Sequence, residues 1–168
     1  MIELCGTASS FFADAKRAVR KCPTLFDWGQ SLLILALFTL AAGVTNAVEP
    51  LFKFSVTPDP SGLLAIAAVA FLVPALAEEL VFRVVLGGRT GRIRAGLAIL
   101  AFMLWHPLQV WLGLPMAQPV FIEPGFLAIT ALLGLTCTVL YRRSGSIWPA
   151  ILLHWLLVVA WKGLTLPA

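Results

Sequence analysis

The chain has 168 residues, of which 60% are apolar and 12% are charged, and its formal net charge is +4. A soluble domain carries about 25% charged residues, so this composition excludes an ordinary soluble protein and indicates a membrane protein. The basic residues cluster in short segments between apolar stretches, and no nucleic-acid-binding motif accompanies them, so we expect contact with lipid headgroups and not with nucleic acid.

Residues 1–28 differ from the rest of the chain because they mix apolar residues with four bases. Phe11, Phe12, Ala15 and Val19 can share one face of a helix, which predicts an amphipathic helix lying on the inner membrane surface. A cleaved signal peptide is not expected, since the bases follow the apolar residues instead of preceding them.

The remainder of the chain is dominated by apolar stretches, and about 20 such residues are enough to cross the hydrocarbon core. We place the spans at residues 31–48, 62–86, 93–113, 125–141 and 147–163. The fold class predicted from this pattern is all-α, a polytopic membrane helix bundle of about five transmembrane helices plus the amphipathic helix. Residues 1–168 are expected to form a single membrane domain.

The second span carries Glu78, Glu79 and Arg83 inside an apolar run. A charge near the middle of a membrane helix costs about 2.5–3.5 kcal/mol on insertion scales, and such residues are functional by default. Glu79 and Arg83 are four residues apart, so we expect them to pair, whereas Glu78 projects about 100° away and stays available for chemistry. Pro74 is expected to open the backbone near residue 70. The alternative is that both acids only anchor Arg83 in a packing network.

The third and fifth spans carry the two histidines of the chain, His106 and His154. A lone membrane histidine is often only a helix–helix hydrogen-bonding residue. Measured from the inner ends of the spans at about 1.5 Å per residue, Glu78 and His154 lie roughly 11–14 Å deep and His106 about 18 Å deep. The similar depths predict a shared cavity in the inner half of the bilayer.

The distribution of basic residues predicts the orientation. They precede the first span and occupy the loops after the second and fourth spans, whereas the alternate loops are mainly acidic. The residues concerned are Lys16, Arg17, Arg20, Lys21, Arg89, Arg92, Arg94, Arg142 and Arg143. Basic loops stay cytoplasmic, so we expect a multi-pass protein of the cell inner (plasma) membrane with its N-terminus in the cytoplasm and its C-terminus outside.

Three segments resemble the motifs of the CPBP family of membrane proteins. AEELVFR resembles its EExxxR motif, FMLWH its FxxxH motif and SIWPAILLH its final-helix motif, and the likeness covers about residues 70–163. The family comprises CAAX prenyl endopeptidase-like and bacteriocin-processing or immunity-associated (ABI) proteins, regarded as glutamate-dependent intramembrane proteases and earlier described as metal-dependent. The compact chain with short loops is typical of bacterial members.

The resemblance implies an endopeptidase that hydrolyses a peptide bond in a membrane-associated peptide or protein, with residues 62–163 as a four-helix catalytic core. Glu78 would be the general base that activates a water. His106 and His154 would position that water or stabilise the oxyanion. The supporting residues would be Glu79, Arg83 and Phe102. No cofactor is expected.

A Zn²⁺ site is the alternative use of the same residues, because Glu78, His106 and His154 make a three-ligand set with an open position. The HExxH motif, which is the usual arrangement of membrane zinc proteases, is missing. The cysteines have no metal-ligand spacing and are expected to be free thiols. They are Cys5, Cys22 and Cys137.

One position departs from the family pattern. Four residues after the last histidine, where the family commonly has Asn or Asp, this chain has Val158, which cannot donate a hydrogen bond or orient an imidazole. Either His106 and His154 suffice, or Gln109 substitutes, or activity is reduced or absent. The rival interpretations are a non-catalytic immunity or scaffold protein on the same fold and a proton or ion pathway.

Overall fold

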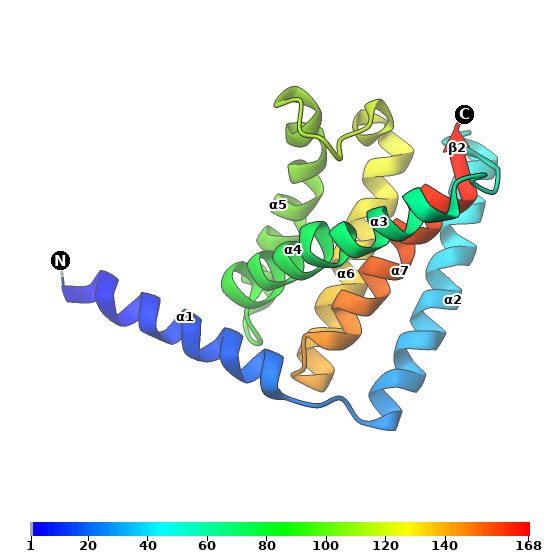
Figure 1. Ribbon diagram of the computed structural model, residues 1–168. Coiled ribbons are helices and arrows are strands. Elements are labelled where there is room, and N and C mark those ends of the chain that lie inside the picture. Colours follow the sequence, from blue (N-terminus) through cyan, green and yellow to red (C-terminus); the bar gives the residue numbers. More distant parts are fainter. Residues whose placement is uncertain (1) are drawn as a thin grey trace.

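The computed structural model describes the backbone of residues 2–168 and the side chains of residues 11–166 and 168. Helices dominate the chain, which confirms the predicted all-α membrane bundle (Figure 1). The segments long and apolar enough to cross a membrane are α2 (Leu25–Val48), the helical run Pro60–Gly87, α5 (Arg92–Trp111) and α6 (Pro124–Ser144). The last helix, α7 (Trp148–Leu164), is apolar but shorter. These elements match the five expected spans closely.

The N-terminal helix α1 (Ile2–Arg20) reaches away from one end of the bundle (Figure 1). Its C-terminal part is attached to the start of α7, because the indole Nε1 of Trp148 donates to the carbonyl of Val19 at 2.8 Å and Ala18 is buried. Phe12 is 78% exposed and thus free to contact lipid. A helix is therefore present where the amphipathic helix is expected, although it ends well before residue 28, and its place on the inner membrane surface stays a prediction.

The first spanning helix, α2, begins earlier than the expected span because a capping box precedes it. The hydroxyl of Thr24 accepts from the backbone N–H of Asp27 at 3.2 Å, and the Asp27 carboxylate accepts from the backbone N–H of Thr24 at 2.8 Å. Such reciprocal bonds satisfy two N–H groups that would otherwise lack partners at a helix start. A hydropathy pattern alone overlooks this polar turn.

A small two-stranded sheet, which the predicted all-helical pattern does not include, joins the segment after α2 to the segment after α7. Strand β1 (Phe52–Phe54) pairs antiparallel with β2 (Thr165–Pro167), at the end of the bundle where the C-terminus lies (Figure 1). The side-chain oxygen of Asn46 accepts from the backbone N–H groups of Leu51 and Phe52, which turns the chain from α2 into β1. This pairing ties the long loop after α2 to the end of α7.

The end of the run Pro60–Gly87 is held by arginines from other helices. Gly88 takes a positive φ of 61° and stops the helix. Arg94 donates two hydrogen bonds of 2.6 Å to the last helical carbonyls, and Arg142 donates to the Gly88 carbonyl at 3.0 Å and to three of its neighbours. The basic segments therefore lie together at one end of the bundle, and the side of the membrane that this end faces stays a prediction.

Candidate functional site

The helical run that carries the two glutamates is irregular. It consists of α3 (Pro60–Ala70), η1 (Phe71–Leu76), α4 (Ala77–Glu79) and η2 (Leu80–Gly87). In η1 and η2 the helix widens to i→i+5 hydrogen bonding. Directly before Pro74, Val73 has extended angles of φ −138° and ψ 116°, so the regular hydrogen bonding is interrupted there. The expected opening is thus present, at Val73. Wide turns of this kind are frequent at functional sites.

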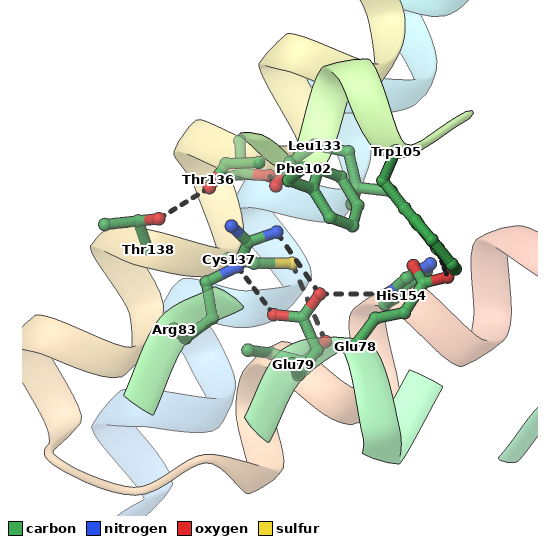
Figure 2. Close-up of polar contacts among 12 residues, drawn as sticks. Glu78, Glu79, Arg83, Phe102, Trp105, Leu133, Thr136, Cys137, Thr138 and His154 are labelled. Atoms are coloured by element: carbon green, nitrogen blue, oxygen red, sulfur yellow. Dashed lines mark hydrogen bonds and ion pairs between the residues drawn. The ribbon is translucent and has the colours of Figure 1, made fainter. Parts of the chain in front are cut away.

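Glu79 is fully buried and is shared between two partners (Figure 2). Its Oε2 accepts from Arg83 Nε at 2.8 Å, and its Oε1 accepts from Arg83 Nη2 at 3.4 Å. The same Oε1 lies 2.9 Å from His154 Nδ1. The expected Glu79–Arg83 pair is therefore present. His154 Nδ1 is thus bonded to Glu79, and the expected role of His154 beside Glu78 stays a prediction that falls to its other ring nitrogen, Nε2.

Phe102 connects these groups from α5. Its buried ring lies beneath the Arg83 guanidinium, with 4.3 Å from Cζ to the ring centroid, a cation–π contact between desolvated groups. The rings of His106 and His154 pack edge-on against the same ring, at centroid distances of 5.1 and 5.7 Å. One residue from each of the three sequence motifs, Arg83, His106 and His154, thus contacts the same phenylalanine ring.

Glu78 has different surroundings from those of its neighbour. Its side chain is buried, and its Oε1 accepts from the indole Nε1 of Trp105 at 2.8 Å (Figure 2). Its Oε2 is buried without a hydrogen-bond partner among the described residues. Since carboxylate lone pairs that are buried are normally satisfied, this oxygen is available to a water or a substrate group.

His106 is enclosed by aromatic rings on the side of the loop between α5 and α6. The short helix η3 (Pro119–Ile122) brings Phe121 to 5.4 Å from the His106 ring, and Phe126 from α6 lies at 5.9 Å, both between ring centroids. These two phenylalanines stack on each other at 4.7 Å. His106 is therefore covered by apolar rings and has no acidic partner of its own among the described contacts.

The hydrogen bonds of the two histidines fix which ring nitrogen carries a proton. A backbone carbonyl only accepts, so Nδ1 of His106, 3.0 Å from the carbonyl of Phe102, is the donor. The same holds for Nδ1 of His154, which faces the Glu79 carboxylate. In each neutral imidazole the other nitrogen, Nε2, then presents a lone pair, and a donor at Nε2 requires a second proton on the ring.

The arrangement does not fit the alternative zinc site. Among the residues that the structure describes, no group of three His, Cys, Asp or Glu side chains could hold a metal ion. Of the cysteines, Cys22 is exposed and free and Cys137 is buried and free, while the side chain of Cys5 lies outside the described residues.

Sequence reasoning missed Trp105 and Phe121. A signal for Trp105 is present, because a buried indole N–H usually finds an acceptor and this residue directly precedes His106. Phe121 lies in the loop between α5 and α6 and carries no comparable signal. Val158 is half-buried on α7, one turn beyond His154, and Gln109 is buried on α5 beyond His106.

A buried carboxylate with a free oxygen lies next to a Glu–Arg–His network inside a bundle of apolar helices, and ionisable groups in such surroundings mark functional sites of membrane proteins. The family described as type II CAAX prenyl endopeptidase, Rce1-like, matches residues 60–160, and the chain belongs to this family. It is therefore a multi-pass membrane protein, as the hydropathy predicted, and it belongs to a protease family, as the motifs predicted. Neither the curated proteins nor the solved structures compared with the chain give a match.

Proposed function

We propose that this protein is an intramembrane endopeptidase that hydrolyses a peptide bond in a membrane-associated peptide or protein, with Glu78 as the general base. One observation carries the proposal: Oε2 of Glu78 is buried and free, while Oε1 is held by Trp105. A carboxylate oxygen without a partner can accept a proton from a water bound within hydrogen-bond reach.

In the proposed reaction Glu78 takes one proton from this water. At the same time the water oxygen bonds to the carbonyl carbon of the scissile peptide. The tetrahedral intermediate carries a negative charge on the former carbonyl oxygen. Protonated Glu78 then gives its proton to the leaving nitrogen as the C–N bond breaks. The products are a new carboxyl terminus and a new amino terminus, and no cofactor takes part.

The two histidines take different roles in this mechanism. His154 donates Nδ1–H to Glu79, an arrangement that in catalytic triads orients the imidazole and stabilises the imidazolium. When protonated, its Nε2–H is the donor to the oxyanion. His106 faces aromatic rings and a carbonyl, so it acts as a neutral imidazole whose Nε2 accepts from the attacking water.

We infer further that the substrate reaches Glu78 from the end of the bundle that carries the basic segments. Glu78 lies nine positions before the end of its helical run at Gly87, which places it about 13 Å deep at 1.5 Å per residue. The opposite side of His106 is covered by Phe121 and Phe126. Because basic segments stay in the cytoplasm, substrates would enter the site from the cytoplasmic side of the inner membrane.

The rival proposal is a non-catalytic binding or immunity role on the same fold, and Val158 favours it. This half-buried valine lies one turn beyond His154, where it adds no hydrogen-bond donor beside the imidazole. The rival predicts that the protein binds a partner without cleaving it, so an assay for cleavage products separates the two functions.

The test compares peptides released from membranes of cells that produce the wild type, Glu78→Gln or Glu123→Gln. Glu123 is exposed in the loop before α6, so Glu123→Gln makes the same chemical change away from the site. We expect products from the wild type and Glu123→Gln, and about 10²- to 10⁴-fold less from Glu78→Gln, the usual contribution of a general base. Equal release by Glu78→Gln would contradict the role of Glu78, and absence of products from all three would favour the rival.

A further inference from the structure

We propose that Trp105 is the positioning residue of this site, which holds the Glu78 carboxylate so that Oε2 stays directed at the attacking water. This inference rests on the proposed function. The indole Nε1 of Trp105 donates to Glu78 Oε1 at 2.8 Å and connects α5 to α4 (Figure 2). Trp105 would act through Glu78, and it contacts no reacting atom itself.

The chemistry of the indole suits this role. Its N–H is a donor only, so it can bind a carboxylate oxygen without exchanging a proton with it. The last torsion angle of a glutamate is broad, and a carboxylate without a fixed partner rotates between orientations. A donor fixed in a helix at 2.8 Å from Oε1 removes that freedom and leaves Oε2 as the free acceptor.

The neighbouring ionic network makes such a restraint necessary. Glu79, one residue away, is engaged by both Arg83 and His154. Arg83 Nη1 is buried without a partner among the described residues. Because a buried unpaired donor and a buried unpaired acceptor each cost free energy, a freely rotating Glu78 carboxylate is attracted to this positive charge. The bond from Trp105 opposes this movement of the Glu78 carboxylate toward Arg83 and keeps Glu78 from pairing with Arg83.

The test compares Trp105→Phe with Trp148→Phe in the full chain, purified and reconstituted. Both substitutions remove an indole N–H and keep an aromatic ring, and both indoles are half-buried donors at 2.8 Å. Trp148 bonds the carbonyl of Val19, away from Glu78. The substrate is the peptide whose release distinguishes wild-type membranes from Glu78→Gln membranes.

We expect Trp105→Phe to lower kcat about 10- to 100-fold, the cost of misplacing a catalytic group, with KM and melting temperature close to those of Trp148→Phe. A purely structural bond predicts instead that the two variants share the same kcat and differ only in stability. Equal kcat values for Trp105→Phe and Trp148→Phe would overturn the proposal while leaving cleavage by the wild type, and hence the proposed function, intact.

A second readout does not depend on cleavage. In ¹⁵N-labelled protein, the indole N–H resonance of Trp105, assigned by its absence in Trp105→Phe, should shift upfield in Glu78→Ala, because its acceptor is removed. The Trp148 indole resonance should stay in place. A Trp105 resonance that is unmoved in Glu78→Ala would show that the bond is not formed and would overturn the proposal even if no substrate is cleaved.

Discussion

The two histidines differ in their surroundings although both rings pack against Phe102. His154 lies on the ionic side of the site, where Glu79 accepts its Nδ1 proton and Arg83 binds the other carboxylate oxygen. His106 lies on an aromatic side, bonded to a backbone carbonyl and covered by Phe121. A positive charge on His154 has a counterion at 2.9 Å, whereas a positive charge on His106 has none among its described contacts.

The same division separates the adjacent acids. Glu79 is bonded to an arginine and an imidazole, so both of its carboxylate oxygens are occupied by partners within the protein. Glu78 has one neutral donor and one free oxygen. Removing one member of a buried ion pair costs about 3–5 kcal/mol of stability. Neutralising a carboxylate whose only partner is an uncharged donor leaves no unpaired charge behind. Neighbouring residues of the same type can thus have distinct roles, one in stability and one in chemistry.

Among substitutions of the two histidines, we expect His154→Asn to lower the cleavage rate the most. Asparagine can still donate to Glu79 from near the Nδ1 position but has no group at the Nε2 position. If His154 is the oxyanion donor, the cleavage rate should fall about 10²- to 10³-fold with the fold retained. Initial rates of peptide cleavage and the melting temperature of the reconstituted protein measure the two effects separately.

His154→Gln provides the control for that substitution. Its amide lies near the Nε2 position, so it should keep more activity than His154→Asn, although it loses the bond to Glu79. Equal activity of the two variants would mean that Nε2 does not act as a donor in the reaction, and the ionic side would then serve stability alone.

A smaller effect is expected from His106→Asn. The amide can keep the bond to the Phe102 carbonyl and loses only an acceptor for the water, so the rate should fall roughly three- to tenfold, in line with one neutral hydrogen bond. Cleavage kinetics of both asparagine variants on one peptide give the comparison. A loss with His106→Asn as large as that with His154→Asn would break the distinction between the ionic and the aromatic side.

Much of the fold follows from local sequence rules. Hydropathy placed the spans because backbone groups in lipid must be satisfied within long apolar helices. The contact between Glu79 and Arg83 followed from a separation of four residues on one helix, and the interruption before Pro74 followed from the missing N–H of proline. Each of these features depends on residues within a turn or two of each other.

The features that the sequence did not reveal depend on how helices are rotated against one another. Depth along the bilayer placed His154 near the acids but did not show that its Nδ1 bonds Glu79. The bond from Trp105 to Glu78 and the pairing of β1 with β2 likewise join distant segments. Helical periodicity gives the face of each residue but not the neighbour that this face meets, so such contacts need a structure.

The central claim is that Glu78 is the general base, whereas Glu79 holds Arg83 and His154 in place and thereby stabilises the fold. Glu78→Gln and Glu79→Gln, purified and reconstituted side by side, test it through the cleavage rate and the melting temperature of each. We predict that Glu78→Gln loses cleavage at a melting temperature near that of the wild type, and that Glu79→Gln melts at a clearly lower temperature because Arg83 is left unpaired. A Glu78→Gln protein that cleaves at the wild-type rate, or a Glu79→Gln protein as stable as the wild type, would contradict it.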